Sequence, residues 1–162
     1  MMNSRVYLRA VPWLIALAFT VGLLARPASA ATPDATALAK VVLAKAGIHV
    51  TVCEMPRVGD GSLAAALAEQ GVPLVHGLAI EAKDADAARK PAVAAGVMGS
   101  QVIIETGTAD ALPLGDSVAD LYLVTDTTDA NLKTLSAAEA GRVLAPYRGV
   151  GWWGIRMAQK VV

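Results

Sequence analysis

Strand-like and helix-like stretches alternate along the chain from residue 32 to residue 156. Apolar positions in 32–47, "TPDATALAKVVLAKAG", recur at helical spacing, and a glycine ends the pattern. A β-branched run at 48–55 follows, and after a glycine turn an alanine-rich helix is expected at 62–70. Later strands are expected at 73–80, 101–106, 118–126 and 149–156, and later helices at 83–96 and 135–146.

This alternation predicts how the strands pair. Strands that are joined by connections long enough for a helix pair in parallel, and near-continuous apolar strands indicate a sheet that is buried on both faces. The sequence therefore predicts an α/β fold, a Rossmann-like doubly wound parallel sheet of about five strands in three layers. Pro91 lies inside the helix expected at 83–96 and should kink or split it.

The first thirty residues have the order of a secretory signal peptide. Arg5 and Arg9 precede an apolar run at 11–25, and Ala28-Ser29-Ala30 forms a small-residue cleavage site. The apolar run is shorter than the ~20 residues that a membrane-spanning helix needs. We therefore expect a signal peptide at 1–30 rather than an uncleaved anchor, and one domain at 31–162 that is exported, periplasmic or secreted, and free of the membrane.

Charge and aromatic content narrow the range of partners. Removal of residues 1–30 removes three arginines and no acid, which leaves 11 basic and 14 acidic residues. The remaining aromatic residues are Tyr122, Tyr147, Trp152 and Trp153, and no Lys/Arg cluster accompanies them. Nucleic-acid-binding surfaces are typically basic and rich in aromatic residues, so we expect no nucleic-acid partner.

Three side chains with chemical potential are expected to be structural. Cys53, the single cysteine, falls in an apolar strand and is expected to act as a small buried residue rather than a reactive thiol. His49 and His76 also fall in predicted strands and have no partner at a metal-ligand spacing. We therefore expect no metal site.

Four loop segments carry the candidate chemistry, because ligands of open parallel sheets lie beyond the carboxyl ends of the strands. They are the glycine turn in "VCEMPRVGDGSLA" (52–64), an acid after the second strand, "GTADALPLGDSVADLYLV" (107–124) and "AGRVLAPYRGVGWWG" (140–154). In this order they resemble class I S-adenosylmethionine-dependent methyltransferases of the type 11-like group, over about residues 35 to 156. The leader, the first helix and "GDGSLAAALAEQ" are also similar to exported methyltransferase-like domains that precede quinoprotein-type β-propellers in bacteria.

The resemblance implies S-adenosylmethionine as cofactor and a methyl acceptor that it does not identify. The cofactor-binding residues it implies are Gly59, Asp60, Gly61, Glu81, Asp110 and Leu112. Glu81 would hold the ribose or be a solvated helix-capping acid, and Asp110 would lie near the adenine. Leu112 and Pro113 would pack beside the adenine or simply within their loop. Asp126 would face the acceptor or cap a turn, and no side chain stands in an evident position for a catalytic base.

Four positions depart from the pattern of the family. Met55 and Ala79 replace acids, Thr108 replaces the adenine-facing acid, and Arg57 replaces the first glycine of the turn. Arg57 would either fill the site or force the loop outward. Glu54, one residue before Met55, points to the opposite face of the strand and needs a bulge to substitute for the missing acid. The loop is therefore degenerate, and a second hypothesis is a non-catalytic interaction or scaffold domain of an exported protein.

The chain ends soon after its fifth predicted strand, where the family adds an antiparallel hairpin. The resemblance thus predicts a sheet that lacks this hairpin and keeps an exposed edge. Either the chain is a truncated product or a partner protein covers the edge. Trp152 and Trp153 would contact that partner or fill the core.

Overall fold

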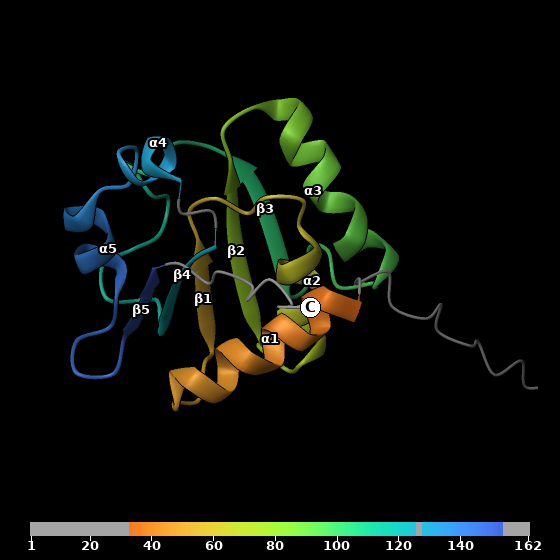
Figure 1. The fold of residues 1–162 in the computed structure, drawn as a ribbon, viewed down its shortest axis with the longest axis horizontal. Helices are drawn as coiled ribbons and strands as arrows, with labels where there is room; N and C mark the ends of the chain where they lie inside the picture. Colours follow the sequence, from red (N-terminus) through yellow and green to blue (C-terminus); the bar gives the residue numbers. More distant parts are fainter. Residues whose placement is uncertain (1–32, 126–127, 154–162) are drawn as a thin grey trace, which may run out of the picture.

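The computed structural model describes residues 33–125 and 128–153. These contain an all-parallel sheet of five strands in the order β3-β2-β1-β4-β5 (Figure 1). The strands are β1 Val52–Met55, β2 Leu74–Ala79, β3 Val102–Thr106, β4 Leu121–Val124 and β5 Val150–Trp153. The chain starts at the centre of the sheet, moves to one edge, returns to the centre and then moves to the other edge. The predicted doubly wound parallel sheet is confirmed.

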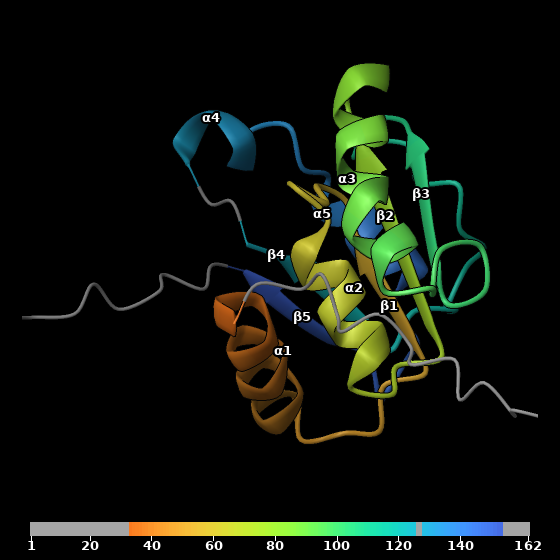
Figure 2. The same ribbon diagram turned by 90° about the vertical axis from the view of Figure 1, so that its right-hand side faces the viewer.

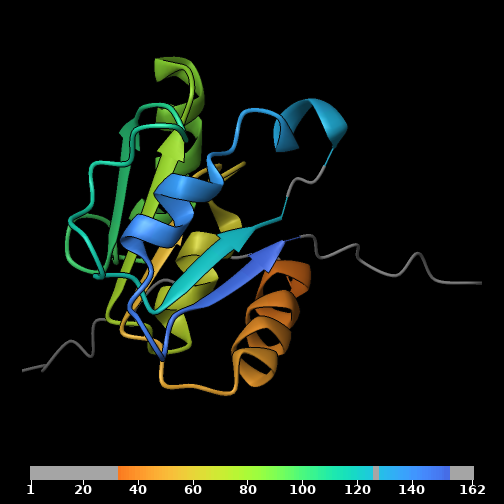
Figure 3. The ribbon, with the colours of Figure 1, turned by 90° about the vertical axis from the view of Figure 1, so that its left-hand side faces the viewer.

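Helices lie on both faces of this sheet. The helices of the described residues are α1 Pro33–Ala46, α2 Ser62–Glu69, α3 Ala82–Ala94, α4 Asp129–Leu132 and α5 Ala137–Val143, of which α4 lies beyond the ends of the strands (Figure 1, Figure 2). Figure 2 shows α1, α2 and α3 on one face, and Figure 3 shows α5 on the other. The three layers are therefore also confirmed.

Each face of the sheet has its own hydrophobic cluster. Residues of α1, α2 and α3 form the larger cluster with Cys53 and Met55 of β1. The smaller cluster joins α5 to Leu78 and Tyr122 on the opposite face. Cys53 is fully buried, as the sequence predicted, and burial raises the pKa of its thiol. The thiol is therefore protonated at neutral pH and acts as a small apolar side chain.

Of the kink or split predicted at Pro91, the split is wrong, because helix α3 runs through Pro91 without a break. The amide of Ala95 donates to the Pro91 carbonyl at 2.9 Å, which continues the helical hydrogen bonds beyond the proline. Ala85, Ala88 and Ala92 are buried in the larger cluster on either side of Pro91. Burial of this alanine face outweighs the hydrogen bond that proline cannot donate.

Other boundaries differ from the sequence expectation. His49 is exposed and precedes β1, so its placement in a strand is wrong. The short helix α4 was not predicted, and the Thr128 side chain caps it by accepting from the Asn131 amide at 3.3 Å. Asp126 lies outside the described residues, as do residues 1–30 and 154–162. The signal peptide and the missing hairpin therefore stay predictions.

Trp152, on the edge strand β5, packs against the larger cluster. Its ring centroid lies 5.7 Å from the Lys45 ammonium of α1, which is within the range of a cation–π contact. This tryptophan therefore fills the core, one of the two roles expected for it.

In the described part of the chain, no helix combines the length and the apolar character needed to cross a membrane.

Asp120 joins the amino ends of three strands. It is 1 % exposed and accepts hydrogen bonds from the Thr51 amide at 2.9 Å, the Thr51 hydroxyl and the Val52 amide at 3.2 Å. Arg148 adds an ion pair at 3.0 Å. Burial favours a higher pKa for Asp120, but the hydrogen bonds and Arg148 outweigh it and lower this pKa. The carboxylate therefore stays ionised and fixes the starts of β1, β4 and β5 relative to one another.

Candidate functional site

Two cavities lie at the carboxyl ends of the strands. The first, of about 360 Å³, lies between the glycine turn after β1 and the junction of β2 with α3. The second, of about 440 Å³, lies between the loop after β3 and residues 133–136, which connect α4 to α5. Arg57 and Ile80 line both cavities and so form a wall that they share. We refer to the two cavities together as the cleft.

Gly61 has a structural role in the glycine turn. Its φ is +78°, and a Cβ at this position would lie 1.9 Å from the Ala88 carbonyl oxygen. Gly59 has a φ of +63° but open space around it, and it lines the first cavity together with Asp60. Gly61 therefore allows α3 to approach the turn, whereas Gly59 and Asp60 face the cleft.

Several amides of this turn already have partners in the fold. The Val58 amide donates to the Leu78 carbonyl at 2.8 Å, and the Gly61 amide donates to the Val58 carbonyl at 3.3 Å. The Ser62 amide donates to Asp60 Oδ1 at 3.0 Å. These three amides are thus engaged by the protein, which reduces the number that a ligand can use.

Arg57 crosses the cleft. From the loop after β1 its Nη1 donates to Thr134 Oγ1 at 3.2 Å, in the segment between α4 and α5. The cavity beside Gly59 and Asp60 remains open. Arg57 therefore does not fill the glycine turn, and it becomes part of the wall between the two cavities.

Glu81, the acid that the sequence offered for the ribose, does not line the first cavity. Glu81 is exposed, pairs with Lys83 at 2.8 Å and is not part of either cavity wall. Ala79 and Asp84 line the first cavity instead. Side chains in the first turn of a helix lean toward its amino end, which brings Asp84 of α3 back to the end of β2. The spacing of Asp84 from the strand was the signal that sequence reasoning missed.

The loop after β3 supplies the second cavity. Thr108 and Asp110 line it, and Lys133 and Pro56 lie on other parts of its wall. Leu112 is buried in the smaller cluster and does not line either cavity. The loop-packing role fits the position of Leu112, while Asp110 lies where a ligand in the second cavity would meet it.

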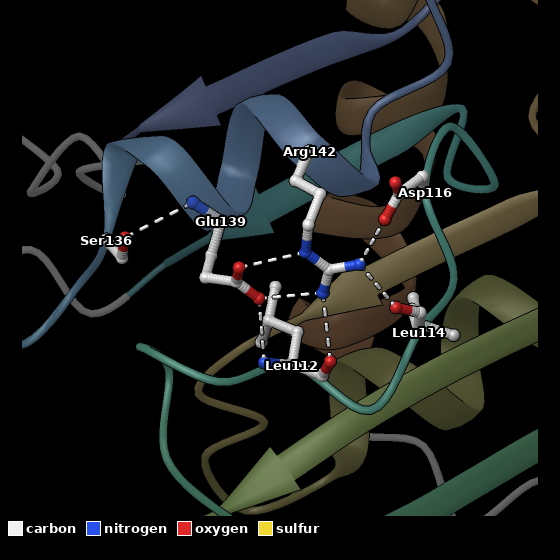
Figure 4. A network of polar contacts seen from close by, with 6 residues as sticks. All are labelled: Leu112, Leu114, Asp116, Ser136, Glu139 and Arg142. Atoms are coloured by element: carbon white, nitrogen blue, oxygen red, sulfur yellow. Dashed lines mark hydrogen bonds and ion pairs between the residues drawn. The ribbon is translucent and has the colours of Figure 1, made fainter.

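Arg142 of α5 holds this loop in place (Figure 4). It donates to the Leu112 carbonyl at 3.0 Å, the Leu114 carbonyl at 2.9 Å and the Asp116 carboxylate at 2.8 Å. It also pairs with Glu139, whose Oε2 accepts from the Leu112 amide at 3.0 Å. Hydrogen bonds from Arg142 and from the Leu112 amide lower the pKa of Glu139 to about 2. Sequence reasoning missed this pair, although Ser136 and Glu139 have the spacing of a helix start.

Glu54 does not reach the cleft. It is fully buried on the face of β1 opposite Met55, and its Oε2 lies 2.6 Å from His76 Nδ1. The register of β1 with β2 is continuous, so no bulge turns this carboxylate toward the loop. His76 Nε2 lies 3.5 Å from the Glu105 carboxylate. Glu54 and His76 therefore form a buried pair within the sheet, and His76 is structural, as predicted.

This buried pair has altered protonation. Burial raises the pKa of Glu54 despite the opposing effect of His76. Burial alone would lower the pKa of His76, but the contacts with Glu54 and Glu105 outweigh it, so this pKa is raised as well. Both shifts mean that the folded pair holds its protons more tightly than an exposed pair. Among the described residues, no three His, Cys, Asp or Glu side chains are grouped to hold a metal ion.

No family model matches the sequence, and no curated protein matches it. Solved structures do match. A Methanococcus maripaludis protein with a proposed S-adenosyl-L-methionine-dependent methyltransferase activity is 22% identical with a TM-score of 0.60, over 70% of this chain and 52% of that one. A methyltransferase of the same type from Thiobacillus denitrificans, in complex with S-adenosyl-L-homocysteine, is 20% identical with a TM-score of 0.55, over 74% and 47%.

The [4+2]-cyclase SpnF also matches, at 20% identity and a TM-score of 0.56, over 68% of this chain and 41% of that one. The chain thus spans about half the length of the solved structures that it matches. Because these include a cyclase, the shared architecture by itself does not determine the reaction. The described chain has the Rossmann-like fold of S-adenosylmethionine-dependent methyltransferases.

Proposed function

We propose that the cleft binds an S-adenosyl cofactor and that the chain is a methyltransferase of the class I type with a degenerate cofactor loop. One observation carries this proposal: the two cavities open at the carboxyl ends of β1 and β2, beside the glycine turn, in a chain with this fold. That end of a doubly wound sheet is where ligands bind. The protein from Thiobacillus denitrificans with bound S-adenosyl-L-homocysteine supports the choice of ligand.

The side chains of the cleft suit the parts of such a ligand. Asp60 and Asp84 in the first cavity offer carboxylate oxygens that accept hydrogen bonds from sugar hydroxyls. Thr108 and Asp110 offer acceptors for a base in the second cavity. Ile80 supplies an apolar surface between them, and it is 53% exposed, as a residue that covers a ligand should be before binding.

The bound cofactor would supply a methyl group on a sulfonium sulfur. The chemistry it would supply is transfer of this methyl group to an electron pair of the acceptor, with the neutral thioether as the leaving group, and Asp60 and Asp84 would hold its sugar. Such a transfer depends mostly on in-line positioning. The described residues of the cleft would contribute that positioning. None of them stands out as a base.

Calorimetric titration of the full chain with S-adenosylmethionine and S-adenosylhomocysteine tests the proposal. We expect a Kd near 1 μM, about −8 kcal/mol. Asp84→Asn should weaken binding about tenfold, since it removes a charged acceptor from the cavity wall. Asp86→Asn is the matched control, because Asp86 lies on the same helix but outside both cavity walls. An absence of heat at millimolar ligand would contradict the proposal.

The second candidate function is a non-catalytic interaction or scaffold domain of an exported protein. Arg57 in the place of a glycine and Glu81 outside the cleft favour it. If this candidate is correct, the native chain does not bind the cofactor, and Arg57→Gly combined with Ala79→Asp recovers binding. Failure of the double variant would show that blockage at these positions is not the main defect.

Export predicts a mature protein that begins at Ala31, which mass spectrometry of the secreted or periplasmic fraction would detect.

A further inference from the structure

Arg57 differs from the other arginines that the structure describes. Arg89 pairs with Asp86, Arg142 with Asp116 and Glu139, and Arg148 with Asp120. Within residues 33–125 and 128–153, Arg57 has no carboxylate within ion-pair distance, and its hydrogen bond goes to the neutral hydroxyl of Thr134. A guanidinium carries five donors in a planar fork that matches a carboxylate. Arg57 therefore has capacity for an anionic partner.

The contact that holds Arg57 is easily exchanged. Its distance of 3.2 Å is at the long end of the range for a hydrogen bond. Thr134 Oγ1 also donates to the Asn131 carbonyl at 2.7 Å, so the hydroxyl keeps a partner when Arg57 leaves. A charge-assisted bidentate pair is roughly twice as strong as a hydrogen bond between neutral groups. A ligand carboxylate would therefore displace Thr134 from the guanidinium at little cost.

Charges around the cleft direct an anionic group toward Arg57. Asp60 and Asp84 line the first cavity, and Asp110 lines the second. These carboxylates repel a ligand carboxylate from the parts of the two cavities that they line. Arg57 stands in the shared wall, and Lys133 is the other cation, on the second cavity alone. A ligand that occupies both cavities must pass Arg57.

We propose that Arg57 binds the α-carboxylate of the amino-acid end of the S-adenosyl ligand and determines specificity for ligands that carry it. This inference rests on the proposed function, because it assumes that an adenosyl ligand occupies the cleft. It gives the replaced glycine a role in recognition rather than in blockage. The adenosyl part binds to the cavity walls on either side of Arg57. The α-carboxylate then replaces the Thr134 hydroxyl as the partner of the guanidinium.

Two ligands that differ only in this end provide the test. S-adenosylhomocysteine carries the amino-acid end, whereas 5′-methylthioadenosine has the same adenosyl thioether without it. We expect the native full chain to bind S-adenosylhomocysteine more tightly, and Arg57→Gln to weaken this binding about 10- to 100-fold. Binding of 5′-methylthioadenosine should change by less than about twofold, because it has no carboxylate to lose. Arg89→Gln is the matched control, because Arg89 pairs with Asp86 and lines neither cavity, and it should change neither affinity by more than about twofold.

Several outcomes would overturn the inference. An equal loss for both ligands in Arg57→Gln would show a general effect on the cleft, and tighter binding of S-adenosylhomocysteine would show that Arg57 obstructs it. If the native chain binds 5′-methylthioadenosine as tightly as S-adenosylhomocysteine, the inference fails while the proposed function stands. If it binds neither ligand, both fail. If Arg57→Gln does not fold, Arg57→Lys provides the same comparison, since it keeps the charge and loses the bidentate fork, and it should weaken only S-adenosylhomocysteine.

Discussion

The amino and carboxyl ends of the strands use their charged groups differently. We call these two sides of the sheet its amino edge and its carboxyl edge. At the amino edge, Asp120 is 1 % exposed and is held by Thr51, Val52 and Arg148. At the carboxyl edge, Arg57 is half-buried and, in the part of the chain that is described, donates to one neutral hydroxyl. Asp120 is satisfied within the fold, whereas Arg57 retains capacity for a ligand. Under the proposed function, charge thus serves stability at one of these edges and binding at the other.

Gly61→Ala should have the largest effect, and it shows where the carboxyl edge still serves the fold. A Cβ would overlap the Ala88 carbonyl in a backbone conformation that side chains rarely adopt. We expect a loss of about 3 kcal/mol or more of unfolding free energy in urea titration. Gly59→Ala has a similar φ but open space, so it should cost only about 1 kcal/mol. Equal losses for the two variants would refute a role for Gly61 in the packing of α3.

Asp120→Asn breaks the amino edge and should rank second. The variant loses the charged acceptor for the Thr51 and Val52 amides and leaves Arg148 without its ion pair. We expect a loss of about 2–3 kcal/mol of unfolding free energy, with cofactor affinity unchanged. Asp116→Asn, at an exposed ion pair, should cost less than about 1 kcal/mol.

The same carboxylate predicts an acid limit for the fold. The pKa of Asp120 is lowered from its ordinary value of 3.8, so its stabilisation is present above pH 3.8 and is lost as the pH falls through the lower, folded pKa. Asp120→Asn should lack this part of the acid dependence. An unchanged acid unfolding curve in the variant would argue against an ionised Asp120.

The buried pair of Glu54 and His76 should give a smaller pH dependence of stability, opposite in sign to that of Asp120. Both pKa values are raised above their ordinary values of 4.5 and 6.5, so the folded state binds protons more tightly than the unfolded chain. The stabilisation is complete below the unfolded pKa values and is lost as the pH rises through the folded ones. Thermal unfolding between about pH 5 and pH 9 should therefore show a falling midpoint in the native chain and a flatter profile in Glu54→Gln. Glu81→Gln, at an exposed acid, should follow the native profile.

Much of the fold was accessible from the sequence because its signals are local. The alternation of β-branched runs with alanine-rich stretches specified five strands and the helices between them, and parallel pairing followed from the length of the connections. The two errors have different causes. His49 belongs to an apolar run but precedes the paired residues of β1, and Pro91 is accommodated by tertiary packing that no local pattern records.

The site was less accessible because it depends on contacts between distant residues. Arg57 and Thr134 are 77 positions apart, and no spacing rule connects them. Sequence reasoning placed an arginine in a glycine loop and could only suppose that it fills or displaces the loop. Asp84 was missed for a different reason: the acid was sought at the end of the strand, whereas the structure brings one from the first turn of α3.

Arg142→Gln should have the smallest effect, and it tests whether the carboxyl edge needs a rigid frame for its ligand. The variant loses the hydrogen bonds to the Leu112 and Leu114 carbonyls, and Glu139 then holds the loop by the Leu112 amide alone. We expect amide hydrogen exchange across residues 107–116 to accelerate about tenfold, and S-adenosylhomocysteine affinity to fall only a few-fold, since Asp110 is displaced but not removed. Arg89→Gln is the matched control, because Arg89 holds the Ile104 carbonyl at 2.7 Å and does not contact this loop. If both variants exchange at the native rate across 107–116, the order of the loop comes from the burial of Leu112, and the polar network is dispensable for the cleft.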